Sequence, residues 1–415
     1  MRFTAIIAAF AAIWLGGSSC QKTSGGDDLI ADTPRSIDLS TKSEAFVRKG
    51  NAFAFEFLRR TDSSEKGGFI ISPLSMQFLL GMVLDGARGE TAGQICEVLG
   101  YGSGETEAVN EYCLSMLKAL PGLDARTTLA IANAIYVDDG WPLLAKYTDT
   151  VGEYYEAAVS NLDFSDGKGS AARINKWCSD RTGGLVPEVI DETDEEMLAY
   201  LLNATYFRSS WSSAFPKGST ASEAFYSADG KKTDVVRMMK KNDRLSYFET
   251  DILSAVRLPY GNGAYTMTVL LPTDGKTTAD VCSALKDTDW SGFTGSMGSA
   301  EVDLWLPKFE TEFKIRLNDM LSDMGMPYAF DEFKADFKAM SDYALCLSFV
   351  QQNAAIKVDE DGTEAAAVSV AGMIKATSAG PADIPVVFHA DHPFLYIISE
   401  ESTGAILFAG RFTGK

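Results

Sequence analysis

Histidine is the first residue type to consider for chemistry, because it is the commonest general base and a leading metal ligand. The chain has only two histidines, His389 and His392, and both lie near the C-terminus. They belong to residues 388–394, a run typical of a strand that enters a turn. No G-x-S-x-G elbow accompanies them, and a Ser-His-Asp triad is defined by geometry, not by residue types alone. The pattern therefore predicts structural or surface histidines, in a protein that is not an enzyme.

Cysteine could supply a second kind of chemistry. The chain has six, Cys20, Cys96, Cys113, Cys178, Cys282 and Cys346. None forms a CxxC pair, and the spacing of a zinc site is absent. The five that follow Cys20 are odd in number and widely scattered, which does not suit a disulfide framework. The sequence therefore predicts buried thiols that act as small apolar side chains, and neither a metal nor a cofactor.

A long stretch of small side chains lies between residues 358 and 386. Residues 362–383 are mostly Ala, Ser, Gly, Thr and Val, with no clear helical stripe. A loop of this length inside a compact chain is usually functional or disordered. The composition alone is compatible with a functional loop and with a flexible linker.

Hydrophobic spacing predicts the elements that would position these groups. Helical spacing indicates helices over residues 43–60, 72–84, 91–99, 108–120 and 313–324, the second of them capped by the serines around Pro73. Apolar runs indicate strands over residues 129–137, 201–207, 255–259, 265–271, 301–306, 344–349, 354–358, 394–398 and 406–409. Helices that precede antiparallel-looking strands indicate an α+β protein.

The charge balance excludes one class of partner. The 415 residues carry 37 basic and 57 acidic side chains, for a formal net charge of −20. Such a surface repels phosphate backbones, so we expect no binding to nucleic acid. A basic partner would suit it, although a charge of this sign often serves only solubility.

The N-terminus has the pattern of an export signal. Residues 1–19 contain one positive charge, an apolar core over residues 4–15 and small residues before Cys20. This resembles the bacterial lipoprotein signal, in which that cysteine is lipidated, although Gly17 stands where leucine is usual. An ordinary secretory signal with an incidental Cys20 is the alternative. Residues 20–42 are polar and indicate a flexible tether, so the lipid would be the only contact with a membrane, at the cell envelope.

Motifs along the rest of the chain occur together in one protein family. Six segments are similar, in order and spacing, to segments of the serpins. They are residues 86–91, 132–136, 174–177, 203–207, 306–309 and 391–396. The resemblance covers about residues 45–415, and we take residues 43–415 as the domain. One further part is similar to the hinge of the serpin reactive-centre loop: Gly362, Thr363, Glu364, Ala365, Ala366 and Ala367. One such motif alone would be weak, but together the motifs are specific.

The resemblance implies a fold of three β-sheets, about eight or nine helices and an exposed reactive-centre loop at about residues 360–385. It also implies a monomer that inhibits serine proteases, with some cysteine proteases also open as targets. The protease attacks the loop and forms an acyl-enzyme, and the cleaved loop inserts as a new strand of the large sheet. The protease is then carried to the far pole before it can deacylate. Strand insertion of this kind is a known form of strand addition and of released strain.

The composition of the hinge suits insertion on physical grounds. A loop that enters between paired strands must bury one face, and an unpaired buried charge is costly. Strand periodicity assigns Thr363, Ala365 and Ala367 to one face, which carries no charge, and Glu364 to the other. No proline occurs over residues 362–380, so the backbone donors remain available. The hinge therefore favours an inhibitory member, and a non-inhibitory serpin that acts as a surface binding protein is the alternative.

The resemblance also assigns roles to residues outside the loop. Glu360 is expected to pair with Lys308 where the sheet opens, with Trp211 packed beside them, unless Trp211 is simply core. Ser72, Ser75 and Asn203 are expected to belong to a hydrogen-bond cluster that controls sheet opening. Gln352 stands where many serpins have histidine, and Gly68 where many have asparagine. Gln352 can still donate and accept hydrogen bonds.

The position of the bait bond follows from the family's spacing. Counting from Gly362 places the bond between Ala376 and Thr377, which suits an elastase-like protease with a small apolar pocket. A shift of one residue would place the bond after Lys375 and imply a trypsin-like target.

Overall fold

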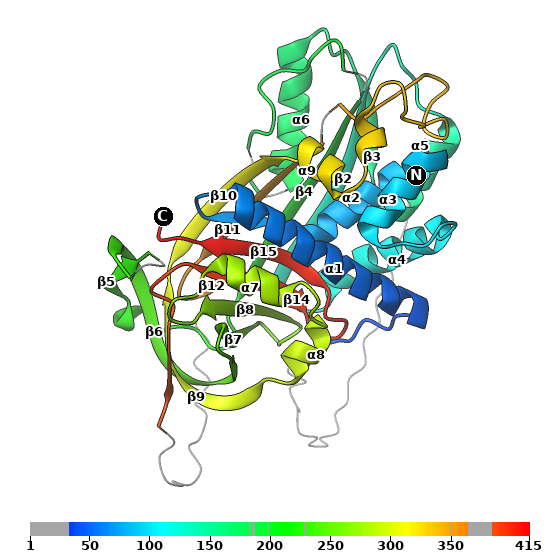
Figure 1. Ribbon diagram of the computed structural model, residues 1–415. Helices are drawn as coiled ribbons and strands as arrows, with labels where there is room; N and C mark the ends of the chain where they lie inside the picture. The colour runs from blue at the N-terminus through cyan, green and yellow to red at the C-terminus, as the bar shows by residue number, and fades with distance from the viewer. Residues whose placement is uncertain are drawn as a thin grey trace, which may run out of the picture. The chain divides into compact units, whose positions relative to one another are not determined.

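The computed structural model describes residues 33–415, except residues 182, 185–186, 198, 228–229, 349 and 364–383. Residues 34–415 form one compact unit. The described part contains nine α-helices and fifteen strands, which confirms the expected α+β class and the expected number of helices (Figure 1). Within the described residues, no helix is both long enough and apolar enough to cross a membrane.

Two helix ends show how the local sequence can set a boundary. The hydroxyl of Ser40 accepts a hydrogen bond from the amide of Ser43 at 3.1 Å and starts α1. Gly100 ends α3 in the left-handed conformation, at φ 71°. The helices are α1 (Thr41–Ser64), α2 (Pro73–Gly86), α3 (Gly89–Leu99), α4 (Thr106–Ala119), α5 (Ala145–Tyr155), α6 (Gly167–Arg181), α7 (Thr278–Leu285), α8 (Trp290–Gly295) and α9 (Asn318–Met324), with short 3-10 turns η1 (Leu120–Gly122), η2 (Lys217–Ser219) and η3 (Pro327–Phe330).

The strands form two hydrogen-bonded networks. One is a six-stranded sheet in the order β10-β11-β12-β4-β2-β3, and the other has the order β1-β15-β14-β8-β7-β6-β9-β13, with β5 paired to β6. The strands are β1 (Phe69–Ile71), β2 (Thr127–Asp138), β3 (Ala158–Leu162), β4 (Ala199–Ser210), β5 (Ala221–Tyr226), β6 (Lys232–Glu249), β7 (Leu253–Tyr260), β8 (Tyr265–Pro272), β9 (Gly298–Pro307), β10 (Phe309–Arg316), β11 (Val350–Val358), β12 (Gly362–Thr363), β13 (Val386–His389), β14 (Phe394–Glu400) and β15 (Ile406–Phe412).

The nine-stranded network divides at β6, the longest strand in the described part of the chain. The last part of β6, Ser246–Glu249, pairs with β7, whereas Met238–Tyr247 pairs with β9. The strand therefore belongs to two sheets in succession. Together with the six-stranded sheet, this gives the three sheets that the resemblance implies.

Two of the predicted elements are wrong. The helix predicted over residues 313–324 is instead strand β10 followed by the short helix α9, because burial alternates along Phe309–Arg316 with the period of a strand. The strand predicted over residues 344–349 is not seen in residues 344–348, and β11 begins at Val350. Helices α5, α7 and α8 were not predicted.

Five of the six cysteines lie in the described part of the chain. Cys96, Cys113, Cys178 and Cys282 are buried free thiols, and Cys346 is a half-buried one. Burial raises the pKa of the Cys96 thiol and that of the Cys178 thiol, the latter to about 12, so both stay protonated at neutral pH. Among the residues described, no cluster of His, Cys, Asp and Glu has the arrangement of a metal site.

Helix α2 lies at the centre of the packing and contacts α1, α4, α5, β4 and β15. Thirteen of its fourteen residues are buried, and Asp85 is the exception. One carboxylate oxygen of Asp85 accepts a hydrogen bond from Asn110 Nδ2 at 2.9 Å, and the other is buried without a partner among the described residues. Burial raises the pKa of Asp85 from 3.8 to about 6, against the opposing effects of Asn110 and of Arg88. The other titratable groups that face Asp85 are Cys113, Tyr147, Tyr154 and Tyr155.

Asp85→Asn is expected to stabilise the protein at neutral pH. The folded state holds the proton of Asp85 more tightly than the unfolded chain does, so this group's contribution to stability is complete below pH 3.8 and is lost as the pH rises through about 6. The midpoint temperature of thermal unfolding at pH 7.5 should therefore be higher by roughly 2 °C or more in the variant, with little difference at pH 4. Asp180→Asn, at an exposed carboxylate, is the control. An equal shift at both pH values would contradict the prediction.

Candidate functional site

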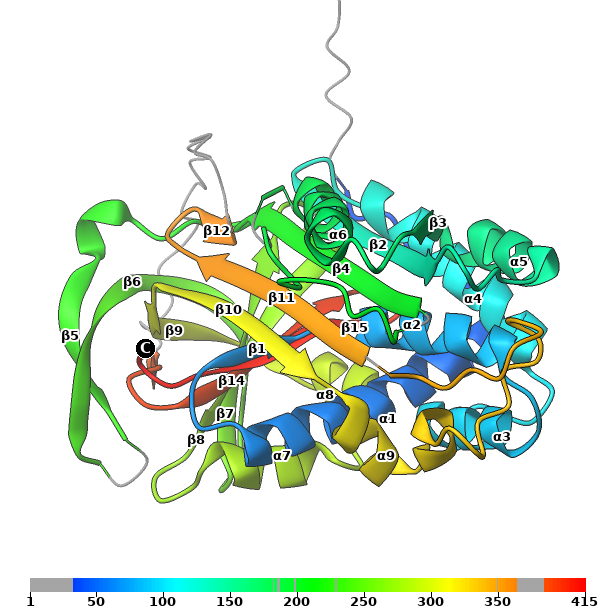
Figure 2. The same ribbon diagram turned by 90° about the horizontal axis from the view of Figure 1, so that it is seen from above.

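The six-stranded sheet is split at one end, between β4 and β11. These two strands pair directly, in parallel, only from Val350–Asn353 to Leu201–Ala204. At the other end β12 lies between them and pairs antiparallel with both (Figure 2). Positions 354–357 of β11 and 205–208 of β4 have no cross-strand partner on their facing sides among the described residues. We call these eight positions the slot.

A tight turn returns the chain from β11 into the split. The amide of Asp359 donates to the carbonyl of Gly362 at 2.8 Å, which closes a hairpin with Glu360 and Asp361 at its tip. Gly362 has φ 153°, and a Cβ atom at this position would lie 2.1 Å from the carbonyl oxygen of Ser209. Only glycine allows so close an approach to β4. Thr363, which follows, is completely buried and pairs with both Val358 and Ser209.

Glu360 fixes the tip of this turn. Its side chain is buried and accepts hydrogen bonds from Lys308 Nζ at 2.6 Å and from the hydroxyl of Thr220 at 2.7 Å. Burial alone would raise the pKa of Glu360, but the bonds from Lys308 and Thr220 outweigh it, so the pKa lies below its ordinary value. The carboxylate is therefore ionised at neutral pH, and the pair expected between Glu360 and Lys308 is present.

Trp211 holds the same turn from the side of β4. Its backbone amide donates to the carbonyl of Asp361, and its indole N–H donates to the carbonyl of Asp359, both at 2.9 Å. The side chain is buried, and its ring stacks on that of Tyr260 at 4.4 Å. Trp211 is thus a core residue that also supplies two hydrogen bonds to the turn.

Gln352 forms a buried cluster with two serines, next to the slot and within the stretch where β11 and β4 pair directly. Its Oε1 accepts from the amide of Ser72 at 2.9 Å, and its Nε2 donates to the carbonyl of Ser72 at 2.8 Å and to the hydroxyl of Ser75 at 3.1 Å. The sequence predicted that Ser72 caps α2. Ser72 does stand at the start of the helix, but its hydroxyl donates to the carbonyl of Leu407 at 2.8 Å and not to the helix. The glutamine therefore ties β11, where the strands are still paired, to the start of α2.

Asn203 lies beside this cluster without being hydrogen-bonded to it. It is opposite Gln352 in the register of β4 and β11. Its amide donates to Asn133 Oδ1 of β2 at 3.0 Å, and its oxygen accepts from the hydroxyl of Thr205, also at 3.0 Å. The structure thus brings Ser72, Ser75 and Gln352 into one network and places Asn203 in a second network on the next strand.

Comparison with known proteins identifies this arrangement. A family model described as serpin (serine protease inhibitor) matches residues 48–414. The chain belongs to the serpin family. An uncharacterized serpin-like protein of Thermococcus kodakarensis is 30% identical to this serpin over 99% of this chain and 98% of its own.

Solved serpin structures share the fold. The thermophilic serpin tengpin in its native state has a TM-score of 0.81 and 27% identity, over 92% of this chain and 96% of its own. Human thyroxine-binding globulin in complex with thyroxine has a TM-score of 0.80 and 25% identity, over 89% of this chain and 98% of its own. The family is one of serine protease inhibitors, which agrees with the expectation of a protein that is not an enzyme.

Several predicted site residues lie outside the described residues of this serpin. These are Cys20, the hinge residues Glu364, Ala365, Ala366 and Ala367, and the bait residues Lys375, Ala376 and Thr377. Their assignments remain predictions from the sequence.

Both histidines lie on strands or turns that follow the loop, as predicted. His389 stacks on Trp305 at 3.9 Å and contacts Asp303 at 3.0 Å, and His392 lies between Asp391 and the carbonyl of Pro272, each at 2.9 Å. The bonds to Asp391 and Pro272 outweigh burial and raise the pKa of His392. Each ring is held by contacts within the fold, which is the arrangement expected of structural histidines.

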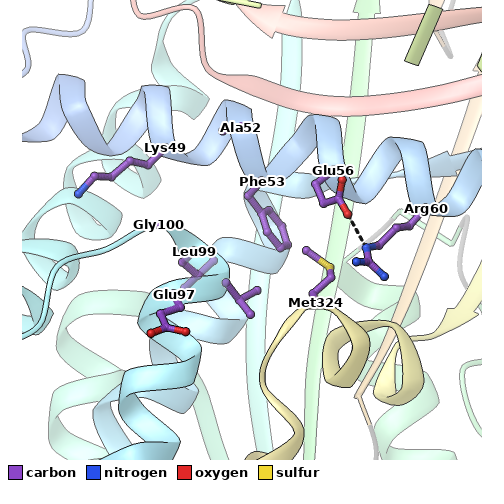
Figure 3. Close-up of a pocket in the computed structure, with 10 residues that line it drawn as sticks. Lys49, Ala52, Phe53, Glu56, Arg60, Glu97, Leu99, Gly100 and Met324 are labelled. Carbon is purple, nitrogen blue, oxygen red and sulfur yellow. Dashed lines mark hydrogen bonds and ion pairs between the residues drawn. The ribbon is translucent and has the colours of Figure 1, made fainter. Parts of the chain in front are cut away.

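A separate hollow of about 290 Å³ lies among α1, α3 and α9 (Figure 3). Its lining includes Phe53, Leu99 and Met324, and Arg60 on its rim pairs with Glu56 at 2.6 Å. None of the predicted site residues lines it. The hollow therefore does not belong to the split of the sheet.

Proposed function

We propose that this serpin inhibits serine proteases by insertion of its cleaved reactive-centre loop between β4 and β11. The observation that supports the proposal is that the first two hinge residues already lie in the sheet: Gly362 pairs with β4, and Thr363 pairs with both β4 and β11. The hydroxyl of the protease's serine would attack the carbonyl carbon of the bait residue and form an ester. The peptide bond would break, and the new amino terminus would leave with the C-terminal part of the chain. Insertion would then precede hydrolysis of the ester by water.

The register of β12 defines the course of insertion. Thr363 is opposite Val358 and Ser209, so continued pairing would place residues 364–367 opposite 357–354 and 208–205. These are the positions of the slot, so four residues can enter without breaking any pairing between β4 and β11. Residue 368 would be the first to compete with the direct pair of Asn353 and Ala204. The small side chains of the hinge suit this entry, because residues 363, 365 and 367 would share the buried face.

Separation of the remaining strand pairs would be the controlled step. The direct pairs over Val350–Asn353 include Gln352, which is tied to Ser72 and Ser75. Displacement of β11 from β4 in this region would disturb a buried and fully satisfied network, which carries a cost in free energy. We propose that this cluster sets the barrier to insertion beyond residue 367.

We propose an elastase-like target, with cleavage between Ala376 and Thr377. Incubation of the purified protein with elastase, and in parallel with trypsin, tests this by denaturing gels and mass spectrometry. The expected result is a complex with elastase that survives denaturant and a released peptide that begins at Thr377. A stable complex with trypsin and a peptide that begins at Ala376 would instead assign the bond after Lys375. Cleavage by both proteases with neither a complex nor a gain in thermal stability would contradict inhibition.

A surface binding protein without inhibitory activity is the second candidate. The likeness to human thyroxine-binding globulin favours it, since that protein's structure contains a bound ligand. The uncharged face of the hinge favours inhibition instead. The gel experiment separates the two, because a binding protein would be cleaved without trapping the protease.

We also propose that residues 1–19 direct export and that Cys20 anchors a monomeric domain to the cell envelope through a lipid and the tether of residues 20–42. Support comes from the sequence pattern, although the compact unit begins at Pro34 and therefore includes residues 34–42 in the domain. Fractionation of cells that produce the protein and its Cys20→Ser variant tests this. Release of the variant alone from the membrane fraction is expected, and an unchanged distribution would contradict the proposal.

A further inference from the structure

Tyr260 touches the hinge, although neither its type nor its position in the sequence indicates this. It is the last residue of β7 and is completely buried. Its hydroxyl shares a hydrogen bond of 2.6 Å with the hydroxyl of Thr363, which is 103 residues away in the chain. Thr363 is itself completely buried between β11 and β4. The bond therefore joins the hinge to a strand of the other sheet.

The ring of Tyr260 is held rigidly in position. It stacks on Trp211 with centroids 4.4 Å apart and an angle of 12°, and it meets Phe207 edge-on at 5.2 Å. Tyr260 and Trp211 also form an isolated backbone bridge, and the amide of Gly261 donates to the carbonyl of Ser210 at 2.7 Å. Because the ring cannot turn away, its hydroxyl stays directed at the hinge.

Neither hydroxyl has a second hydrogen-bond partner among the contacts of the described residues. Burial raises the pKa of Tyr260 far above its ordinary value, so the phenol keeps its proton and remains able to donate. If Thr363 left the sheet, the phenol would remain buried with no partner, which is unfavourable. The bond thus stabilises the state in which the hinge is inserted relative to the state in which it is expelled.

We propose that Tyr260 is a positioning residue that holds Thr363 in the sheet, so that the first step of strand insertion is complete before any protease cleaves the loop. The proposal rests on the proposed inhibitory function for its kinetic consequence, but its conformational part is independent of that function. A strand that is already started needs no new nucleus and can extend one pair at a time through the slot. Loss of the bond would therefore slow insertion relative to hydrolysis of the acyl-enzyme.

The conformational part is tested without a protease. Amide hydrogen exchange of the peptide that covers residues 359–363 is compared in the full protein and in Tyr260→Phe, which removes only the hydroxyl. Exchange in the variant should be faster by roughly tenfold, the effect of one lost buried hydrogen bond. Tyr265→Phe is the matched control, because Tyr265 is also buried against Phe207 but its hydroxyl donates to the carbonyl of Leu120. Equal exchange in the protein and in Tyr260→Phe would overturn the proposal.

The kinetic part is tested with a protease that the serpin is found to trap. The measured quantities are the rate of attack on the loop and the number of inhibitor molecules consumed per protease molecule trapped. Tyr260→Phe should change the rate of attack by no more than about twofold and raise the number of inhibitor molecules consumed by roughly threefold or more. Only the competition between insertion and hydrolysis after cleavage changes. A faster attack by the protease with an unchanged number of inhibitor molecules consumed would overturn the proposal. It would mean that the bond limits access of the protease to the loop and does not assist insertion. If no protease is trapped by the unaltered protein, the proposed function fails while the exchange result still decides the role of Tyr260.

Substitution of the partner separates this hydrogen bond from general packing. Thr363→Ser keeps a hydroxyl and should behave as the unaltered protein does, whereas Thr363→Val should match Tyr260→Phe in exchange and consumption. The double variant Tyr260→Phe/Thr363→Val should be no worse than either single variant, as for two groups that act through one bond. Additive effects of the two substitutions would overturn the proposal.

Discussion

Under the proposed mechanism, Thr363→Arg is expected to convert the protein from an inhibitor of the protease into a substrate. The side chain of Thr363 is completely buried between β11 and β4, and its hydroxyl is hydrogen-bonded to that of Tyr260. Burial of an unpaired charge is strongly unfavourable, so the hinge should stay out of the sheet. Each 1.4 kcal/mol added to the insertion barrier slows it about tenfold, and we expect the yield of trapped protease to fall by about 10- to 100-fold. Titration of the protease with inhibitor, read on denaturing gels, measures this yield.

The neighbouring position provides the control for Thr363→Arg. Strand periodicity places Glu364 on the opposite face of the inserted strand, so Glu364→Arg should keep most of the trapping. Cleavage of the loop should proceed at a similar rate in both variants, because the bait residues are unchanged. Normal trapping by Thr363→Arg would show that the buried pairing of Thr363 is not used during inhibition.

Arg411→Met is expected to cause the largest loss of stability, about 3–5 kcal/mol. The guanidinium group of Arg411 is buried and paired with Asp62 at 2.8 Å. It also donates to the carbonyls of Asp62 and Gly67 at 2.9 and 2.8 Å and to that of Glu65, and lies over the ring of Phe69. Methionine fills the volume but leaves a buried carboxylate and several carbonyl groups without donors. The midpoint of unfolding in denaturant measures the loss.

An exposed ion pair shows what a smaller effect should look like. Lys176 and Asp180 form a pair of 2.7 Å on the surface of α6, with both side chains more than half exposed. Lys176→Met should therefore change stability by less than about 1 kcal/mol. Equal losses in Lys176→Met and Arg411→Met would mean that the buried network around Arg411 contributes no more than a surface pair.

Local periodicity explains which elements could be predicted. The alternation of Val302, Leu304 and Leu306 predicted β9, and all three are completely buried. The helix predicted over residues 313–324 failed because Phe313, Leu317, Met320 and Leu321 also fit helical spacing. Pairing with β11 over the whole of β10 decided in favour of a strand, and such pairing between distant segments leaves no local signal.

The site was predictable only where a motif carried it. Glu360 and Lys308 were paired on the strength of a family resemblance, since 52 residues separate them. Tyr260 was not identified, because the strand predicted over residues 255–259 ends one residue before it and its partner Thr363 is brought to it by a different sheet. Ser72 stands at the start of α2 as predicted, but its hydroxyl bonds to the carbonyl of Leu407, an acceptor that the distance in sequence hides.

Under the proposed mechanism, the parallel pairing of β4 with β11 limits how often one molecule can act. The direct pairs between β4 and β11 are parallel, whereas Gly362 and Thr363 pair antiparallel with their neighbours. Antiparallel pairing is slightly more stable per residue, so an inserted loop would replace weaker pairs by stronger ones. A loop that replaced them would have no route back, because its cut end could not be rejoined. Each molecule would then serve once, and the defence would be set by copy number and by the rate of synthesis, with no turnover to amplify it.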